Sequence, residues 1–404
     1  RRHTRYPLVT GVQTCALPIS QVESFFALHT LSMRVAIATE SFLPSVNGVT
    51  NSVLRILDFL DAYGHEALVI APETDDLPKR YLDFPVKPVP AIQLKRFIPI
   101  GIPRLAIRHL IEGFDPDVVH LASPALFGAY VSRAARELKI PCLSVYQTDV
   151  ANFARHYGFT LGTKQVSKFV ARLHDRTDRT LVPSQASFQE LNKFGTRNIH
   201  IWPRGVDLMR FTPRNRDASL RNSWGASQKI IIGYVGRLAA EKSLEDLEVL
   251  LDIPDVQLVI VGDGPEKRRL EKRLTGAIFA GARHGSDLAS YYASFDFFVH
   301  TGRNETFCQT IQEALASGVP VLAPRSGGPI DLITDGRNGF LYDPRNVRDL
   351  PKCLSDLRNL DPEELSFAAR ESVSTRDWTS INKALLDHYK AISKAHNRVE
   401  EYVA

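Results

Sequence analysis

Two glutamates that flank the start of a predicted helix, Glu305 and Glu313, are the residues of this chain best placed to do chemistry. They lie between two apolar runs, residues 295–299 and 319–323, that we interpret as strands. Eight residues are a little over two helical turns, so both carboxylates can reach one ligand along the helix N-terminus. The unpaired N–H groups there, predicted at residues 306–309, would hold a phosphate, and the carboxylates would accept hydrogen bonds from hydroxyl groups on either side of it. This layout suits a ligand with a sugar, a diphosphate and a ribose in series, whereas an arbitrary glutamate pair at this spacing is usually a solvated helix face.

Two cations, Arg237 and Lys242, follow another apolar run, residues 230–235, which ends at Gly236. A continuous apolar run that ends in glycine before a polar helix start is typical of a buried parallel strand that turns into a helix. Ligands bind at the carboxyl edge of such sheets, where the two cations can neutralise a diphosphate. Away from a strand end, an arginine and a lysine at this spacing would be interpreted as solvated surface charges.

Together with further short stretches, these residues resemble the retaining family-4 glycosyltransferases of GT-B fold, which use nucleotide-diphosphate sugars. The further stretches are Asn47-Gly48-Val49, Arg204-Gly205-Val206-Asp207, Gly262-Asp263-Gly264 and Gly327-Gly328. Within the family the likeness is strongest to the GDP-mannose-dependent α-mannosyltransferases of actinobacterial type, which build mannosylated glycolipids. That likeness is carried by residues 40–44, 117–124, 145–149 and 305–309.

The resemblance implies roles for the candidate residues. Arg237 and Lys242 would stabilise the negative charge of the departing nucleotide diphosphate. Glu305 would orient the donor sugar, and Glu313 would bind the ribose. The further donor-binding candidates are Gly48, Gly236, Asp263, Arg283, Thr306, Phe307, Cys308, Gln309 and Thr310. The resemblance also implies retention of configuration, by attack of the acceptor on the same face of the sugar and without a protein nucleophile.

Two departures from the wider family concern Gln147 and Arg204. Many members carry histidine at position 147, and a neutral amide cannot act as a base, although it can hydrogen-bond a sugar hydroxyl. Asp149 is the nearest ionisable group and a candidate base on the acceptor side, with an Asx-turn or a helix cap as an equally weighted alternative. Arg204 stands where asparagine is common, and no role is assigned to it. His120 follows a strand, but a single histidine there is more often structural.

Regular alternation of strands and helices from Met33 onward predicts parallel sheets wrapped by helices, in two doubly wound Rossmann-like domains that face a central cleft. The strands of the first half are predicted near 34–39, 66–71, 117–121, 141–146, 179–182 and 198–202, and its helices near 49–63, 125–139, 164–177 and 184–194. The strands of the second half are predicted near 229–235, 256–261, 277–280, 295–299 and 319–323, and its helices near 243–251, 265–274, 286–293 and 308–317.

The predicted fold class is therefore α/β, with four segments. Residues 1–32 are interpreted as a non-native or disordered leader, because strand-like order begins only at Met33. Residues 33–212 are expected to bind the acceptor, and residues 213–375 the nucleotide sugar. Residues 376–404 are expected to form a helix that crosses back to the first domain, as the resemblance implies.

Several other classes of site are disfavoured. Asp115-Pro-Asp117 has the form of a metal-binding Asp-x-Asp motif but lies away from the predicted donor site, so no metal is expected. Gly262-Asp-Gly264 lacks the spacing of a dinucleotide fingerprint, so no NAD or other cofactor is expected. The four cysteines are scattered, which disfavours disulfides and structural zinc. A net charge of +5 without a basic stripe disfavours nucleic acid as a partner.

Charge is divided between the halves, because basic residues are in excess in residues 33–215 and acidic residues in residues 216–404. In the first half, a segment that mixes cations with apolar residues could sit on an anionic membrane surface. Its cations are Lys95, Arg96, Arg104 and Arg108. A loop packed on its own domain is the equally weighted alternative. The first interpretation places the protein in the cytoplasm, peripheral on the inner face of the plasma membrane.

The sequence thus predicts a retaining transferase that moves mannose from GDP-mannose to a lipid-linked or polyol acceptor. Three alternatives stay open: a transferase for another nucleotide sugar, a nucleotide-sugar epimerase of the same fold, and a catalytically silent binding subunit. The glutamate pair and the Gln147 loop favour a transferase over an epimerase. The acceptor, the linkage, the nucleobase and the oligomeric state are not predictable from these residues.

Overall fold

The computed structural model describes residues 32–45, 47–94, 98–101, 106–122, 124–147, 163–225 and 228–403. Some residues considered above lie outside these ranges: Lys95, Arg96, Arg104, Asp149 and the leader up to residue 31.

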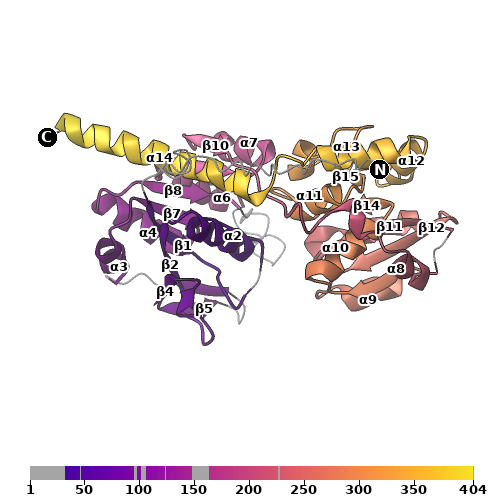
Figure 1. Cartoon of the computed structure of the whole chain (residues 1–404), viewed down its shortest axis with the longest axis horizontal. Helices are drawn as coiled ribbons and strands as arrows, with labels where there is room; N and C mark the ends of the chain where they lie inside the picture. The colour runs from indigo at the N-terminus through magenta and orange to yellow at the C-terminus, as the bar shows by residue number, and fades with distance from the viewer. Residues whose placement is uncertain are drawn as a thin grey trace, which may run out of the picture.

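The first half of the chain forms a lobe around an eight-stranded sheet of order β10-β9-β8-β7-β1-β2-β4-β3 (Figure 1). Its strands are β1 (Arg34–Thr39), β2 (Glu66–Pro72), β3 (Arg80–Tyr81), β4 (Phe84–Val89), β7 (Val118–Ala122), β8 (Cys142–Val145), β9 (Arg179–Val182) and β10 (Ile199–Ile201). The short β3 runs antiparallel to β4, whereas the other described pairs of this sheet are parallel. A separate hairpin joins β5 (Ala91–Leu94) and β6 (Ile98–Gly101).

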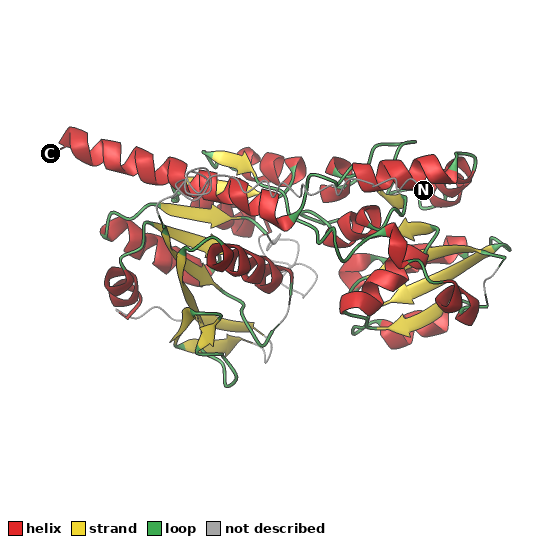
Figure 2. Ribbon diagram, viewed as in Figure 1, coloured by secondary structure: helices red, strands yellow, loops and turns green. Residues whose placement is uncertain are grey.

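Helices cover this first sheet (Figure 2). They are α2 (Gly48–Ala62), α3 (Ala106–Phe114), α4 (Leu126–Glu137), α6 (Thr163–His174) and α7 (Gln185–Lys193). Asn47 caps α2, because its side chain accepts hydrogen bonds from the N–H groups of Val49 and Thr50 at 2.9 and 3.0 Å. The cap fixes the start of α2 directly after the loop that follows β1.

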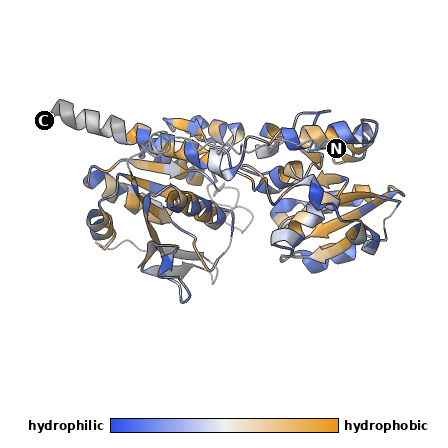
Figure 3. Ribbon diagram, in the orientation of Figure 1, coloured by the Kyte–Doolittle hydropathy of each residue, from blue (hydrophilic) through white to orange (hydrophobic). Residues whose placement is uncertain are grey.

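The second half forms another lobe, with a six-stranded sheet of order β13-β12-β11-β14-β15-β16. Its strands are β11 (Ile230–Val235), β12 (Val256–Val261), β13 (Ile278–Gly281), β14 (Phe297–Val299), β15 (Val321–Pro324) and β16 (Gly339–Tyr342). Its helices are η1 (Pro213–Asn215), α8 (Ala218–Ser223), η2 (Ala240–Lys242), η3 (Leu244–Leu250), α9 (Lys267–Arg273), α10 (Gly285–Ser294), α11 (Gln309–Ala316), η4 (Gly328–Asp331), α12 (Asp349–Arg358) and α13 (Pro362–Glu371). All of its described strand pairs are parallel. The strands of both sheets are predominantly apolar (Figure 3), as expected for sheets buried on both faces.

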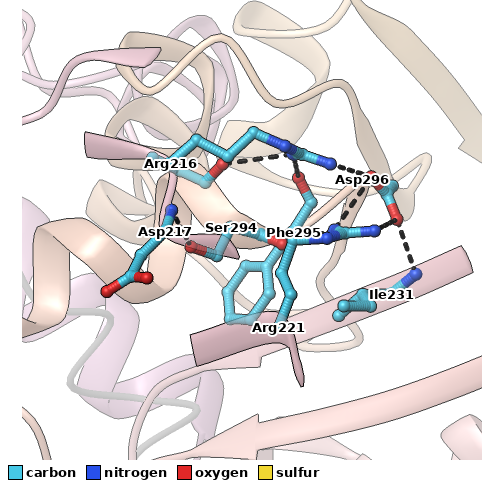
Figure 4. A network of polar contacts seen from close by, with 8 residues as sticks. Arg216, Asp217, Arg221, Ile231, Ser294, Phe295 and Asp296 are labelled. Carbon is cyan, nitrogen blue, oxygen red and sulfur yellow. Dashed lines mark hydrogen bonds and ion pairs between the residues drawn. The ribbon is translucent and has the colours of Figure 1, made fainter. Parts of the chain in front are cut away.

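A polar network fastens the segment between the lobes to the second sheet (Figure 4). Asp296, just before β14, accepts hydrogen bonds from Arg216 at 2.5 Å and from Arg221 at 3.1 Å. The same carboxylate accepts the N–H of Ile231 at the start of β11, at 2.8 Å. Asp296 therefore connects the start of β11, the start of β14 and the segment between the lobes, and it fixes where the second lobe begins.

The last helix, α14 (Trp378–Val403), leaves the second lobe and runs along the first one (Figure 1). Ile381 and Leu385 are buried in the same apolar cluster as Val35 of β1 and Ile56 of α2. The helix α14 therefore packs on the first half of the chain, and the assignment of residues 376–404 as a separate segment stays a prediction. The proposed domain boundaries after residues 32, 212 and 375 stay predictions.

The predicted alternation is confirmed, with local corrections. Residues 243–251 were expected to form an α-helix, but Leu244–Leu250 form a 3-10 helix after Ser243, whose φ of 49° interrupts the helical backbone. Its buried leucines recur every third residue, which matches a 3-10 period. Elements without a counterpart among the expected ones are β3, β4, β5, β6, β16, α3, α8, α12 and α13. No described helix is long and apolar enough to cross a membrane.

Candidate functional site

The segment that carries the two glutamates is a loop followed by α11, which lies within one residue of the expected helix at each end, although its unpaired N–H groups differ from those expected. Cys308 adopts a φ of 88° and is the N-cap, so the helix begins at Gln309. The N–H groups without an intrahelical partner therefore start at residue 308 and not at 306. Glu305 precedes the helix, and Glu313 lies in its second turn.

Two glycines hold the loop in place. The N–H of Gly328 donates to the carbonyl of Glu305 at 2.8 Å. A Cβ at Gly327 would lie 2.5 Å from that carbonyl oxygen, and a Cβ at Gly328 would lie 2.3 Å from the carbonyl oxygen of Phe307. Only residues without a side chain allow this approach, which accounts for the Gly327-Gly328 motif.

Glu305 is bound by two cations through the same oxygen. Its Oε1 lies 2.5 Å from Nζ of Lys242 and 3.3 Å from Nε2 of His300. Burial alone would raise the pKa of Glu305, but Lys242 and His300 hold it well below its usual range. The carboxylate is therefore ionised, and Oε2 is not used by either cation.

His300 was missed by the sequence analysis, although it follows β14 directly. Burial would lower the pKa of this imidazole, but Cys308 and Glu305 raise it to about 9. The ring stacks on Tyr234 of β11, with centroids 6.5 Å apart. Its position at the carboxyl end of a strand was the only sequence signal, and that signal does not separate a functional histidine from a structural one.

Glu313 has a different environment. Its Oε2 accepts a hydrogen bond from the hydroxyl of Tyr292 on α10 at 2.9 Å. Burial raises the pKa of Glu313 to about 7, against the lowering effects of Tyr292, Arg210 and Arg204. Among the described residues, no lysine or arginine reaches ion-pair distance of this carboxylate.

The two predicted cations also differ. Lys242 is mostly buried against Glu305, whereas the side chain of Arg237 is 52% exposed and lies 3.9 Å from Oε1 of Glu241. Arg237 is thus the freer of the two to meet an incoming anion. The backbone beside it is tightly packed, because a Cβ at Gly262 would lie 1.9 Å from the carbonyl oxygen of Gly236.

Two donor-binding candidates are engaged locally. Asp263 accepts the N–H of Gly264 at 2.7 Å and lies 3.6 Å from Lys267. Arg283 donates to the carbonyl of Ala280 and covers the ring of Tyr291. Both side chains follow strand ends, as predicted, and their roles stay predictions.

Residues of the first lobe meet this segment. The hydroxyl of Thr306 donates to the carbonyl of Gln147 at 2.9 Å, and the side-chain amide of Gln309 donates to the carbonyl of Gly205 at 3.0 Å. The amide group of Gln147 is buried, and neither of its polar atoms has a hydrogen-bond partner in the part of the chain that the structure describes. Gly48 is the first residue of α2, and its carbonyl accepts a hydrogen bond from Arg204.

Other predicted residues fall in different surroundings. Phe307 is buried, and the hydroxyl of Thr310 lies 3.4 Å from Sγ of Cys308.

His120 is bonded to the hydroxyl of Tyr389 on α14 at 2.7 Å. Burial lowers the pKa of His120 to about 3, which fits a structural residue. Arg108 is half exposed and 3.9 Å from Glu137.

The Asp-x-Asp motif has a structural use. A carboxylate oxygen of Asp117 accepts the N–H of Arg34 at 2.7 Å, at the start of β1. Asp115 has a φ of 49° and belongs to the turn that ends α3. Asp117 therefore has a structural role, because its carboxylate binds the backbone at the start of β1 in the first sheet.

Comparison with known proteins adds family and fold. Residues 46–210 match the model described as Glycosyltransferase Family 4, and residues 217–371 match Glycosyl transferases group 1. The GDP-mannose-dependent alpha-mannosyltransferase of Corynebacterium glutamicum is 46% identical over 378 residues, which are 91% of this chain and 91% of that protein. The protein of the same name from Mycolicibacterium smegmatis is 46% identical over 367 residues, 89% of this chain and 98% of that protein.

A solved structure bears on the fold alone. Sucrose-phosphate synthase from Thermosynechococcus elongatus superposes with a TM-score of 0.72, over 90% of this chain and 100% of that one, at 19% identity. The two lobes, each with a parallel sheet, form the GT-B fold, as predicted.

Proposed function

Because the chain belongs to the glycosyltransferase family that includes the GDP-mannose-dependent alpha-mannosyltransferases, we propose that it transfers mannose from GDP-mannose to a lipid-linked or polyol acceptor with retention of configuration. The observation that carries this proposal is the arrangement of Lys242, His300 and Glu305 beside α11, together with the contact between Thr306 and Gln147 of the other lobe. An ionised carboxylate next to fixed cations suits a sugar that is bound through its hydroxyl groups and a leaving group that gains negative charge.

The proposed reaction breaks the bond between C1 of mannose and the β-phosphate oxygen, which leaves positive charge on the sugar and negative charge on GDP. Arg237, Lys242 and the N–H groups at the start of α11 stabilise the departing diphosphate more than the bound donor. Glu305 accepts hydrogen bonds from hydroxyl groups of the sugar through Oε2, and Glu313 accepts hydrogen bonds from the hydroxyl groups of the ribose. Gln147, which cannot act as a base, bonds a sugar hydroxyl.

The acceptor oxygen attacks C1 on the face that the diphosphate leaves. The proton of the acceptor hydroxyl passes to an oxygen of the departing phosphate. The bond between C1 and the phosphate oxygen is thus replaced by the new glycosidic bond, and GDP leaves with the proton. Asp149 is the alternative proton acceptor. This scheme needs no protein nucleophile and no resident cofactor.

We also propose that the first lobe docks on an anionic membrane, on the inner face of the plasma membrane, where it meets a lipid acceptor. The segment with Lys95, Arg96, Arg104 and Arg108 is one contact. The exposed face of α6 supports the proposal, because Lys168, Phe169 and Arg172 are exposed there and the helix has no acidic residue. Cations next to an exposed aromatic ring suit an anionic lipid surface.

Incubation with labelled GDP-mannose and a lipid extract tests the transfer. The proposal expects label in the lipid fraction. Isomerised free sugar nucleotide would indicate an epimerase, and neither product would indicate a binding subunit, so both outcomes contradict the proposal. Calorimetric titration with GDP and UDP tests which nucleobase the protein prefers. Tighter binding of UDP would overturn the choice of GDP-mannose.

Sedimentation with anionic vesicles tests the docking. The wild type is compared with a Lys95/Arg96/Arg104/Arg108→Ser variant and with a Lys168/Arg172→Ser variant. Binding should weaken with salt, because exposed charges are screened beyond about 8 Å at physiological ionic strength. Equal, salt-insensitive binding by all three proteins, or no binding at all, would remove the membrane from the proposal.

A further inference from the structure

The side chain of Arg204 reaches between the two parts of the molecule that carry the candidate donor-binding residues. Its guanidinium donates from Nη2 to the carbonyl of Gly48, at the first turn of α2 in the first lobe. On the other side, the backbone carbonyl of Arg204 accepts the side-chain amide of Gln312 on α11 at 2.9 Å. Gln312 is next to Glu313 in the sequence, so the backbone of Arg204 lies against the helix that carries the carboxylate that we assign to the ribose.

The described residues leave most of the hydrogen-bonding capacity of this guanidinium unused. An arginine has five N–H donors, and the carbonyl of Gly48 uses one of them. The Nε of Arg204 is buried and has no hydrogen-bond partner within the described ranges. A buried donor without a partner is costly, and that cost is removed when an acceptor binds.

The charge of Arg204 survives its burial. Burial lowers the pKa of its guanidinium to about 10, and Glu313 opposes that shift, so the group is cationic at neutral pH. No carboxylate of the described residues forms an ion pair with Arg204, in contrast to Arg216 and Arg221, which share Asp296. A cation without a counter-ion among the described residues, at the first turn of α2, is suited to an anionic ligand.

We propose that Arg204 is a donor-binding residue, which holds the diphosphate of the nucleotide sugar from the side of the first lobe, opposite Arg237. The planar guanidinium can bond two phosphate oxygens while Nη2 keeps its contact with Gly48. This inference rests on the proposed use of a nucleoside diphosphate sugar, but it does not depend on which base or sugar the donor carries. It accounts for an arginine at a position where the wider family has asparagine.

The alternative that must be excluded is a purely structural contact, in which Arg204 only connects Gly48 to the segment before the linker. The backbone of that segment is held independently. The N–H of Val206 donates to the carbonyl of Arg376 at 2.8 Å, and Gly205 packs against Trp378. Substitution of the Arg204 side chain alone should therefore leave the connection between the lobes in place.

The test is a series of calorimetric titrations with guanosine, GMP and GDP. They are run on the wild type, Arg204→Gln and Arg204→Lys. Gln removes the charge and keeps an N–H donor, and Lys keeps the charge without the planar fork. Arg197→Gln is the matched control, because Arg197 is an exposed arginine of the first lobe that is paired with Asp175 at 3.0 Å, and its substitution removes the same charge away from the site.

We expect Arg204→Gln to weaken the binding of GDP by about tenfold or more. The binding of guanosine should weaken by less than about threefold. Arg204→Lys should give an intermediate loss, and Arg197→Gln should behave like the wild type. Unchanged GDP affinity in Arg204→Gln would overturn the proposal in favour of a structural contact. An equal loss for guanosine and GDP would also overturn it, because the residue would then act through the ribose site.

Failure of the proposed function is distinguishable from failure of this inference. If the wild type prefers UDP to GDP, the choice of donor is wrong, and the same series with uridine, UMP and UDP still tests Arg204. Thermal melts of each variant show whether it is folded before the titrations are compared.

Discussion

Glu305 and Glu313 have the same side chain and lie on one continuous segment, yet their surroundings are opposite. Glu305 is held by Lys242 and His300, and its pKa lies well below the usual range. Glu313 has a tyrosine hydroxyl as its hydrogen-bond partner, and burial raises its pKa to about 7. One end of the segment therefore has a permanent negative charge, and the other end gains its charge close to neutral pH.

This difference shows that the spacing of two carboxylates does not determine their chemistry. The charge state of each is set by its tertiary contacts, since Lys242 lies 63 residues from Glu305 and follows β11, whereas His300 follows β14. A permanently ionised group suits the sugar, where positive charge develops in the reaction. A group that ionises near neutrality suits the ribose, where a bound ligand stabilises the charge.

The largest effect is expected from Lys242→Ala. Without the ammonium, the Glu305 carboxylate is buried beside His300 alone, and loss of one partner of a buried ion pair costs roughly 3–5 kcal/mol. We expect a lower melting temperature and a decrease in kcat/KM of at least about tenfold. Thermal melts and steady-state kinetics measure the two effects.

Arg237→Ala is the matched variant at the same strand end. It should also lower kcat/KM by about tenfold or more, because it removes a charge-assisted contact to the diphosphate. Its melting temperature should be close to that of the wild type, since the exposed pair with Glu241 contributes about 0–1 kcal/mol. Equal destabilisation by both variants would contradict the assignment of Lys242 to Glu305 and of Arg237 to the donor.

A smaller effect is expected from His300→Gln. The pKa of His300 in the folded protein, about 9, is above its value of 6.5 in the unfolded chain, so protonation of the ring stabilises the fold. That contribution is complete below about pH 6.5 and is lost as the pH rises through about 9. The difference in melting temperature between wild type and variant should therefore shrink over this range.

His120→Gln provides the control for that experiment. Its folded pKa of about 3 is below the unfolded value, so its contribution is lost only as the pH falls. Between about pH 6.5 and about pH 9 its difference from the wild type should stay constant. A difference for His300→Gln that is equally constant would show that the imidazole is not a partner of Glu305.

The smallest effect is expected from removal of divalent metal. In our account, Lys242 and Arg237 supply the positive charge that a metal ion would otherwise supply at the diphosphate. Treatment with EDTA should leave the rate of transfer unchanged. Loss of activity with EDTA and its recovery with magnesium would contradict this use of the two cations.

The sequence was sufficient for the parts of the fold that repeat a pattern. Apolar runs that end in glycine marked β11 and β12, and they brought Arg237 and Lys242 to a strand end as predicted. It was not sufficient for β4, whose two prolines, Pro85 and Pro88, disguise a strand that lies near the edge of its sheet. It placed the start of α11 within one residue, although nothing in the sequence indicates that Cys308 adopts a positive φ.

The candidate site was predictable by residue type but not by pairing. The sequence assigned Lys242 to the diphosphate, and it did not indicate that the ammonium is also bonded to Glu305, a contact across 63 residues that the packing of β11 against β14 creates. No role for Arg204 was predictable from the sequence, because its partner Gly48 is 156 residues away. Burial and tertiary contact, which set both pKa values, are not encoded in local spacing.

The pH dependence of GDP binding tests the comparison between the two glutamates most directly. Calorimetric titrations of the wild type and Glu313→Gln are run on the acid and the alkaline side of about pH 7. The glutamine variant corrects for the titration of the phosphate itself. Our account predicts that the wild type gains affinity as the pH rises through about 7, by about tenfold more than the variant, because only an ionised Glu313 makes charge-assisted bonds to the ribose. The same pH dependence in both proteins would contradict the account.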